Sequence, residues 1–161
     1  DCPPAIGYQS MNAVFAADML YVPSGPGYWE YDSTTSFIGQ LSEALADLSG
    51  FEGVVPAGTL QLPKVFQDVR FLLTRYEPGN ELHRAMRSAF EKVWEDRVTQ
   101  HPIEMTRAVE QSGRFLSSIY EIDYREMTRE TWRRARASFD RAYEEFRDHA
   151  LTAWDKLEDE A

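Results

Sequence analysis

Residues 69–74, Val69-Arg70-Phe71-Leu72-Leu73-Thr74, are the stretch that decides the fold class of this chain. A short apolar run of this kind is typical of a strand inside a sheet. A second run, Met19-Leu20-Tyr21-Val22, is closed by Pro23. Continuous apolar runs without alternation indicate strands that are buried on both faces, as in parallel sheets.

Helical patterns lie between and after these two strands. Residues 33–48 and 81–94 carry apolar side chains three or four residues apart, which is the period of an amphipathic helix. A short helix is predicted over residues 10–17, with Ser10 as its N-cap. A long helix is predicted over residues 128–158, with Thr128 as its N-cap and this apolar stripe: Trp132, Ala135, Phe139, Tyr143, Phe146, Ala150 and Trp154.

The alternation of strands and helices predicts an α/β fold with a doubly wound, mainly parallel sheet and flanking helices. Residues 98–100 are a candidate third strand, residues 23–27 a loop, and residues 49–65 a long irregular insertion. Residues 115–122 are apolar but ambiguous in type. Ligands bind such sheets at the carboxyl ends of the strands. Here those ends are at Asp1, Pro23, Thr74-Arg75 and His101-Pro102.

Composition narrows the function classes. The 161 residues are 43% hydrophobic and 13% aromatic, which suits one folded domain, or a large piece of one, and excludes intrinsic disorder. No apolar run approaches the roughly 20 residues of a membrane span. The single cysteine, Cys2, excludes a disulfide framework, a zinc ribbon and a self-contained iron–sulfur site, and makes the cytosol the default compartment.

Charge restricts any contact with nucleic acid to a local patch, because the formal net charge is −10. The concentrated basic stretch holds Arg129, Arg133, Arg134, Arg136 and Arg141. At 100° per residue, Arg129, Arg133 and Arg136 share one helix face, which is suited to DNA phosphates. A solvated face with ion pairs to nearby acids is the alternative. Arg107 and Arg114, in a predicted loop around Ser112-Gly113, are further candidates.

Two other groups of residues carry weaker signals. His83, His101 and His149 are far apart and show no metal-ligand spacing with Cys2. Residues 28–31 (YWEY) are predicted to lie in a loop, as a partner surface or packed over the sheet edge. The acidic end of the long helix disfavours attraction to anionic lipid, so no membrane partner is expected.

The first four residues, Asp1-Cys2-Pro3-Pro4, suggest a chain that starts at a strand end. A carboxylate there can hold a hydrated magnesium ion beside a nucleotide phosphate, while a turn former or helix N-cap is the alternative.

Four segments resemble a known family. Residues 1–20 (DCPPAIGYQSMNAVFAADML) are similar to the segment that begins at the Walker B aspartate of ParA-type partition ATPases, in the deviant-Walker P-loop group. Residues 71–78 (FLLTRYEP) resemble the strand and turn that approach the adenine in that group. Residues 118–121 and 131–140 (TWRRARASFD) resemble the C-terminal region of the plasmid RepA branch.

The resemblance implies a P-loop NTPase-like fold, with residues 1–161 as the C-terminal portion of a single ParA-like ATPase domain. Asp1 would hold Mg²⁺ through water. The nucleotide would lie against Thr74, Arg75, Pro102, Ile103 and Glu104, and residues 107–113 would lie near the dimer and DNA-facing surface. A KGGxGK(S/T) loop is absent from these residues, so the segment alone is not expected to hydrolyse ATP.

By the same resemblance, the whole protein would be a plasmid or chromosome partitioning ATPase that binds ATP and Mg²⁺, forms a homodimer and binds DNA non-specifically. A ParB/RepB-type centromere-binding partner would stimulate hydrolysis, and the protein would be cytoplasmic and nucleoid-associated. Two alternatives stay open. One is a deviant-Walker ATPase that positions a cargo other than DNA, with residues 51–65 as the changed partner site. The other is a nucleotide-free interaction module.

Overall fold

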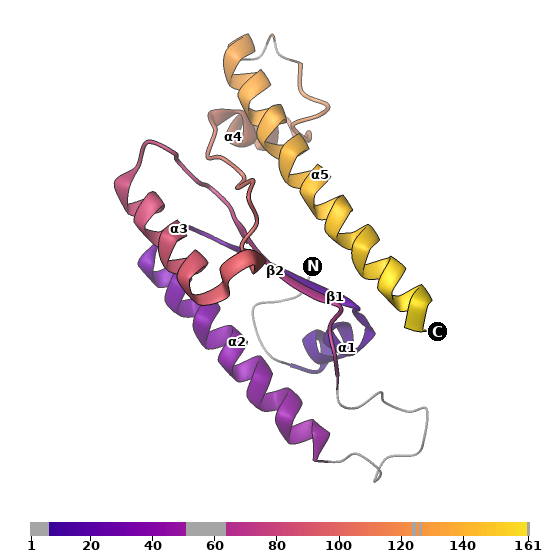
Figure 1. Ribbon diagram of the computed structural model, residues 1–161. Coiled ribbons are helices and arrows are strands. Elements are labelled where there is room, and N and C mark those ends of the chain that lie inside the picture. Colours follow the sequence, from indigo (N-terminus) through magenta and orange to yellow (C-terminus); the bar gives the residue numbers. More distant parts are fainter. Residues whose placement is uncertain (1–6, 51–63, 124, 126, 161) are drawn as a thin grey trace.

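The computed structural model describes residues 7–50, 64–123, 125 and 127–160. These residues form a mixed α/β structure that is mostly helical (Figure 1). The elements in chain order are α1 (Tyr8–Ala16), β1 (Met19–Ser24), α2 (Tyr28–Ser49), β2 (Asp68–Leu73), α3 (Glu81–Trp94), the 3₁₀ turn η1 (Glu95–Arg97), α4 (Arg107–Arg114) and α5 (Arg129–Glu160). The predicted magnesium ligand Asp1 and most of the predicted insertion lie outside the described residues.

Strands β1 and β2 are parallel neighbours, with Met19 opposite Asp68 and Ser24 opposite Leu73. Both predicted strands are confirmed, but β1 continues through Pro23 and Ser24, which were predicted as loop. The Thr74 N–H donates to the Ser24 carbonyl (2.8 Å), so Ser24 turns its backbone groups towards β2. Pro23, one residue earlier, turns away from β2, and its missing N–H costs no ladder hydrogen bond there.

A third strand over residues 98–100 does not form. Val98 makes only an isolated parallel bridge to Phe71, and Glu104 makes another to Tyr76. Thr99 and Ile103 donate to the carbonyls of Phe71 (2.9 Å) and Leu73 (2.8 Å), so the segment follows β2 with an interruption. The described residues therefore contain one two-stranded parallel β-α-β unit and a broken third segment. This unit is the part of the predicted doubly wound sheet that the described residues show.

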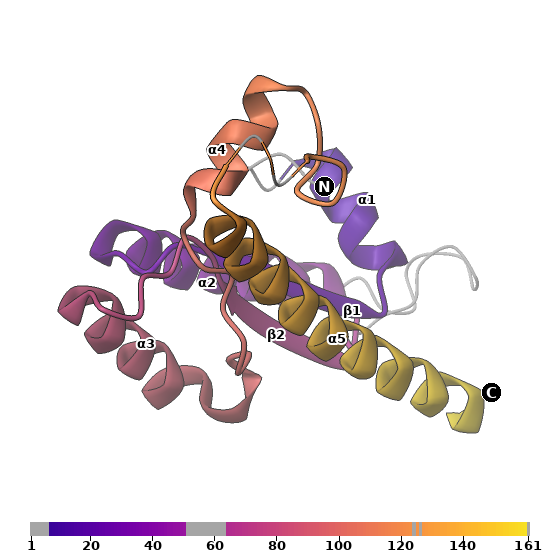
Figure 2. The same cartoon turned by 90° about the horizontal axis from the view of Figure 1, so that it is seen from above.

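Helices cover both faces of these strands. Helices α2 and α3 lie on one face, and α5 runs past the other (Figures 1 and 2). On the first face Phe71 stacks on Trp94, with ring centroids 4.3 Å apart. On the second face Tyr21 meets the edge of Phe146 at 5.1 Å. The main core cluster consists of Val22, Phe71, Leu73, Tyr76, Phe90 and Val98.

Helix α5 forms as predicted, and its cap is confirmed. The Thr128 hydroxyl accepts a hydrogen bond from the Thr131 N–H (3.2 Å), and its carbonyl accepts one from Trp132 (3.1 Å). The predicted stripe is only partly correct, because Tyr143 and Trp154 are exposed. The most buried described positions of α5 are small: Ala135, which belongs to the predicted stripe, and Ser138, Ala142 and Ala153, which do not. Small side chains let the helix backbone approach its neighbours closely, and the larger rings flank the contact.

Three helix starts differ from the sequence prediction. Ser10 is not a cap but lies inside α1 and is buried. Residues 28–31 are the first turn of α2, because Gly27 is extended and Glu30 suits the positive end of the helix. Residues 107–114 are a helix rather than a loop, because Ala108 and Ser112 are buried on one side of α4, which packs against α5. Residues 115–122 form turns after it.

Within the described ranges, no helix is both long enough and apolar enough to cross a membrane.

Candidate functional site

The predicted nucleotide-binding residues come from two segments that the structure brings side by side at the carboxyl end of β2. Ile103 donates its N–H to Leu73 (2.8 Å), and Tyr76 donates to Ile103 (3.0 Å). Met105 then donates to Tyr76 (2.9 Å). Residues 74–76 and 102–105 therefore form one continuous hydrogen-bonded edge.

Arg75 has a left-handed backbone, with φ of 55°, and its guanidinium lies 3.1 Å from a carboxylate oxygen of Glu30 in the first turn of α2. Glu30 was not predicted as a site residue, because residues 28–31 were expected to form a loop and not the first turn of α2. The Glu30 side chain lies against Gly25 and Gly27, where an added Cβ atom would collide with it. The glycines of the β1–α2 connection thus leave room for the Glu30–Arg75 ion pair.

The turn at residues 102–104 is held by α5. The Glu104 N–H donates to the Ser138 hydroxyl oxygen (2.7 Å), and that hydroxyl donates to the Pro102 carbonyl (3.3 Å). The Glu104 carboxylate lies 3.7 Å from Arg134 and 3.6 Å from Arg141, both on α5. Ser138 is almost completely buried, so this polar attachment is shielded from water.

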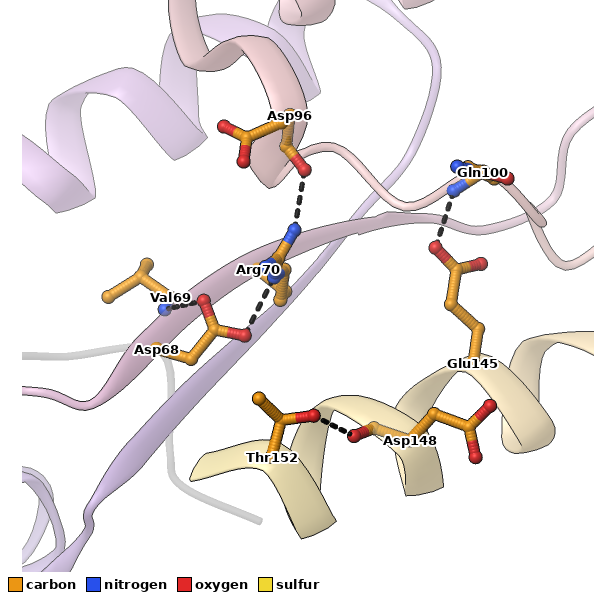
Figure 3. Close-up of polar contacts among 8 residues, drawn as sticks. All are labelled: Asp68, Val69, Arg70, Asp96, Gln100, Glu145, Asp148 and Thr152. Carbon is orange, nitrogen blue, oxygen red and sulfur yellow. Dashed lines mark hydrogen bonds and ion pairs between the residues drawn. The ribbon is translucent and has the colours of Figure 1, made fainter. Parts of the chain in front are cut away.

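A second attachment lies just before the turn, at the break in the third segment. One Glu145 carboxylate oxygen accepts the Gln100 N–H (2.7 Å; Figure 3). The other accepts the His101 N–H (2.9 Å) and lies 3.0 Å from His101 Nδ1. Glu145 therefore satisfies the two amides that leave the sheet, and the following residue, Pro102, has no N–H to satisfy.

Replacing Glu145 with alanine is expected to lower the free energy of unfolding by about 2–3 kcal/mol, because it leaves two backbone amides without their charged acceptor. Urea denaturation measures the change. Glu144→Ala is the matched control, since Glu144 is the exposed neighbour on the same helix. An equal effect of the two variants would contradict the role of Glu145.

A cavity of about 640 Å³ opens beside this edge. Its lining residues are Tyr76, Glu77, Pro78, Gly79, Asn80, Glu104, Met105 and Arg134. Asn80 caps α3 by accepting the Leu82 N–H (3.0 Å), and the Glu77 N–H donates to His83 Nδ1 (3.0 Å). The volume lies within the range of small-molecule pockets. Of the five predicted nucleotide-binding residues, Glu104 lines this cavity, whereas Thr74, Arg75, Pro102 and Ile103 are not among its lining residues.

The predicted DNA-binding arginines fall into three groups. Arg129 and Arg133 line, with Arg134, Glu130 and Ala137, a hollow of about 580 Å³ on α5. Arg136 instead lies over the rings of Tyr120 (5.2 Å) and Trp132 (4.9 Å), so its guanidinium is engaged in cation–π contacts. Arg107 and Arg114 are exposed at opposite ends of α4.

Ion pairs separate these arginines further. Within the described residues, Arg107, Arg114, Arg129 and Arg133 have no carboxylate within 4.0 Å, whereas Arg134 and Arg141 share Glu104. The i, i+4 ion pairs of the alternative prediction are not seen for Arg129 and Arg133 among the described residues, and both side chains are exposed to solvent, so the choice between a DNA-binding face and a solvated face stays a prediction.

Histidine and acidic side chains do not assemble into a metal site in the described part of the chain. His101 binds Glu145, and His83 accepts from Glu77. The prediction for Asp1 stays untested, because that residue is not among those described.

The Tyr21 side chain lies against α5, and its phenol hydroxyl has an unusual environment. Its hydroxyl is buried with no hydrogen-bond partner in the described residues. Burial, with a smaller contribution from the Glu145 carboxylate, raises the pKa of Tyr21 far above its usual value. The hydroxyl therefore stays neutral in the folded protein.

This pKa predicts a loss of stability at alkaline pH. The unfolded phenol ionises near pH 10, but the folded one resists ionisation, so the stability is complete below about pH 10 and falls above it. Denaturant unfolding from about pH 8 to about pH 11, a range around the pKa of the unfolded phenol, measures the slope of the free energy of unfolding against pH. Tyr21→Phe is expected to flatten it, whereas the fully exposed Tyr8→Phe is not; equal slopes in all three proteins would refute the prediction.

The fold and this edge define a mixed α/β protein whose β-α-β unit presents two adjacent loops and a long helix with an arginine-rich N-terminal half. No protein-family model matches the chain. It is 26% identical over 154 residues to putative replication protein A of Rhizobium rhizogenes, covering 96% of this chain and 36% of that protein. It is 25% identical over 154 residues to putative replication protein A of Sinorhizobium fredii.

The chain is also 30% identical over 140 residues to protein SopA of Escherichia coli K12, covering 84% of this chain and 32% of SopA. It spans about a third of the length of these relatives. The replication protein A matches agree with the RepA-branch resemblance of the sequence.

Proposed function

We propose that this chain is part of a ParA-type ATPase that partitions plasmids or chromosomes. The observation that carries the proposal is the continuous edge formed by residues 74–76 and 102–105, the two segments expected from the sequence to contact adenine. The similarity to SopA and to the replication A proteins, over 84–96% of this chain, supports the same assignment.

In this proposal the edge binds the base of ATP. Thr74 and Arg75 lie against one side, Pro102, Ile103 and Glu104 against the other, and Asp1 holds Mg²⁺ through water. The phosphate groups of bound ATP, together with Mg²⁺, favour a homodimer over the monomer. The 161 residues hold no glycine-rich lysine loop, so the β- and γ-phosphates are bound by residues other than these.

In the proposal, DNA binds at the hollow around Arg129 and Arg133 on α5. Arg136, on the same helix, and Arg107 and Arg114, at the two ends of α4, contribute further contacts. Such contacts read phosphates and no base sequence. Two copies of the surface in a dimer raise the avidity without any new contact. A ParB/RepB-type partner stimulates hydrolysis and so returns the protein to its weakly binding state in the nucleoid.

Photolabelling tests the nucleotide part. The full-length protein is irradiated with 8-azido-ATP and Mg²⁺ and digested, and the labelled peptides are identified by mass spectrometry. Labels within residues 74–78 or 102–105 that disappear with excess ATP are expected. Labels confined to other peptides would overturn the assignment of the edge.

Fluorescence anisotropy tests the DNA part. Two duplexes of equal length and unrelated sequence are titrated at salt concentrations from about 50 to 200 mM, a range over which phosphate contacts weaken strongly. Equal affinities for both duplexes and a linear fall of log K with log salt are expected. Binding to only one duplex, or to neither, would refute non-specific DNA binding.

A further inference from the structure

Glu104 brings a negative charge from the turn at residues 102–104 onto the arginine-rich N-terminal half of helix α5. Its carboxylate lies 3.7 Å from the Arg134 Nε and 3.6 Å from an Arg141 terminal nitrogen. The Glu104 side chain is only 19% exposed, whereas those of Arg134 and Arg141 are 60% and 49% exposed. One sheltered carboxylate therefore faces two guanidinium groups that also reach water.

The backbone keeps this carboxylate in place. Ser138 lies on α5 between the two arginines, and its hydroxyl accepts the Glu104 N–H at 2.7 Å. The same hydroxyl donates to Pro102, and Ile103 donates to β2. Glu104 is thus fixed by its own main chain opposite Arg134 and Arg141, whereas the long arginine side chains can move.

Arg134 also belongs to the basic hollow. It lines the same 580 Å³ depression as Arg129 and Arg133, and Arg141 lies two helical turns further along the same side of α5. Without Glu104, Arg134 and Arg141 would add two guanidinium groups without that carboxylate partner to those of Arg129 and Arg133 on the N-terminal half of α5. With Glu104 in place, two of the four already have a carboxylate partner.

We propose that Glu104 restrains DNA binding by occupying Arg134 and Arg141, which are two further phosphate-binding residues of α5. The inference rests on the proposed function, since it concerns the same DNA surface. A carboxylate and a phosphate use the same guanidinium donors, and half-exposed ion pairs are weak enough for a phosphate to compete. Glu104 therefore lowers the affinity without abolishing it.

The position of Glu104 also links the two parts of the proposed site. It belongs to the turn assigned to the base of the nucleotide, and it lines the 640 Å³ cavity together with Arg134. Any shift of that turn changes the distance between its carboxylate and the two arginines. The positive charge of α5 that is available to DNA phosphates then changes with that distance.

The test is the DNA affinity of Glu104→Gln, measured by anisotropy across a salt series on the full-length protein. Glutamine keeps the shape and removes the charge. The affinity is expected to rise about three- to tenfold, and the salt slope to steepen by up to about 1.8, the value for two added phosphate contacts. Glu43→Gln, an exposed change of equal charge on the distant helix α2, is the matched control and is expected to have little effect.

A double-mutant cycle isolates the ion pairs. In a background with Arg134→Gln and Arg141→Gln, the Glu104→Gln change is expected to leave the affinity unaltered. An equal rise in that background, or a rise no larger than that of Glu43→Gln, would overturn the inference. Circular dichroism verifies that each variant is folded. If the unaltered protein binds no duplex, the proposed function fails, and that result is distinct from binding that is insensitive to Glu104.

Discussion

Replacing Phe90 with alanine is expected to lower the free energy of unfolding by about 3–5 kcal/mol, the usual cost of deleting a large buried ring. Phe90 lies on α3, is 0% exposed and belongs to the main core cluster with Phe71 and Leu73. Its ring meets the edge of Tyr31 at 5.1 Å and lies 4.8 Å from Trp94. The deletion therefore removes both apolar burial and two aromatic contacts.

Urea or thermal denaturation measures this effect, and Val93→Ala is the control. Val93 lies on the same helix and is 54% exposed, so its truncation is expected to change the stability by no more than about 0.5 kcal/mol. A Phe90→Ala variant as stable as Val93→Ala would mean that α3 does not pack on the strands as described.

Replacing both Arg129 and Arg133 with alanine is expected to weaken DNA binding on the order of 50-fold at 0.1 M salt, if each arginine contributes one phosphate contact. The slope of log K against log salt is expected to shrink by about 1.8. Both side chains are exposed, and neither has a carboxylate within 4.0 Å in the described residues. The loss is therefore one of charge and not of folding.

The matched control removes two positive charges elsewhere. Lys92→Ala with Lys156→Ala changes the net charge equally, and both lysines are exposed and remote from the basic hollow. The control is expected to keep most of the affinity. Equal losses in the two double variants would show that DNA responds to overall charge and not to this surface of α5.

Local sequence patterns were sufficient for the regular elements of the core. The apolar runs at residues 19–22 and 69–73 lie in strands β1 and β2, the helix Glu81–Trp94 has its predicted bounds, and Thr128 caps α5. Each of these depends on residues within a few positions of one another, where hydrophobic period and capping chemistry act directly. The two segments that resemble adenine-facing motifs lie side by side at the end of β2, and their contact with a nucleotide stays a prediction.

Local sequence patterns gave wrong predictions where the burial of small residues or contacts with distant segments decide the local structure. Residues 107–114 were predicted as a loop because of Ser112-Gly113, yet they form a helix since Ala108 and Ser112 are buried. Residues 28–31 were predicted as a loop because of the nearby glycines and prolines. The predicted stripe of α5 consisted mostly of large rings, with two alanines, whereas the most buried described positions are Ala135, Ser138, Ala142 and Ala153.

The sequence by itself determined where the two strands and the main helices form, because those choices are settled between near neighbours in the chain. Only the tertiary structure decided how the site is held together. Glu145 binds Gln100 across 45 positions, Glu30 pairs with Arg75 across 45, and Ser138 binds Glu104 across 34. Contacts at such separations leave no periodic signal in the sequence, because they arise only when packing brings the two segments into hydrogen-bonding distance.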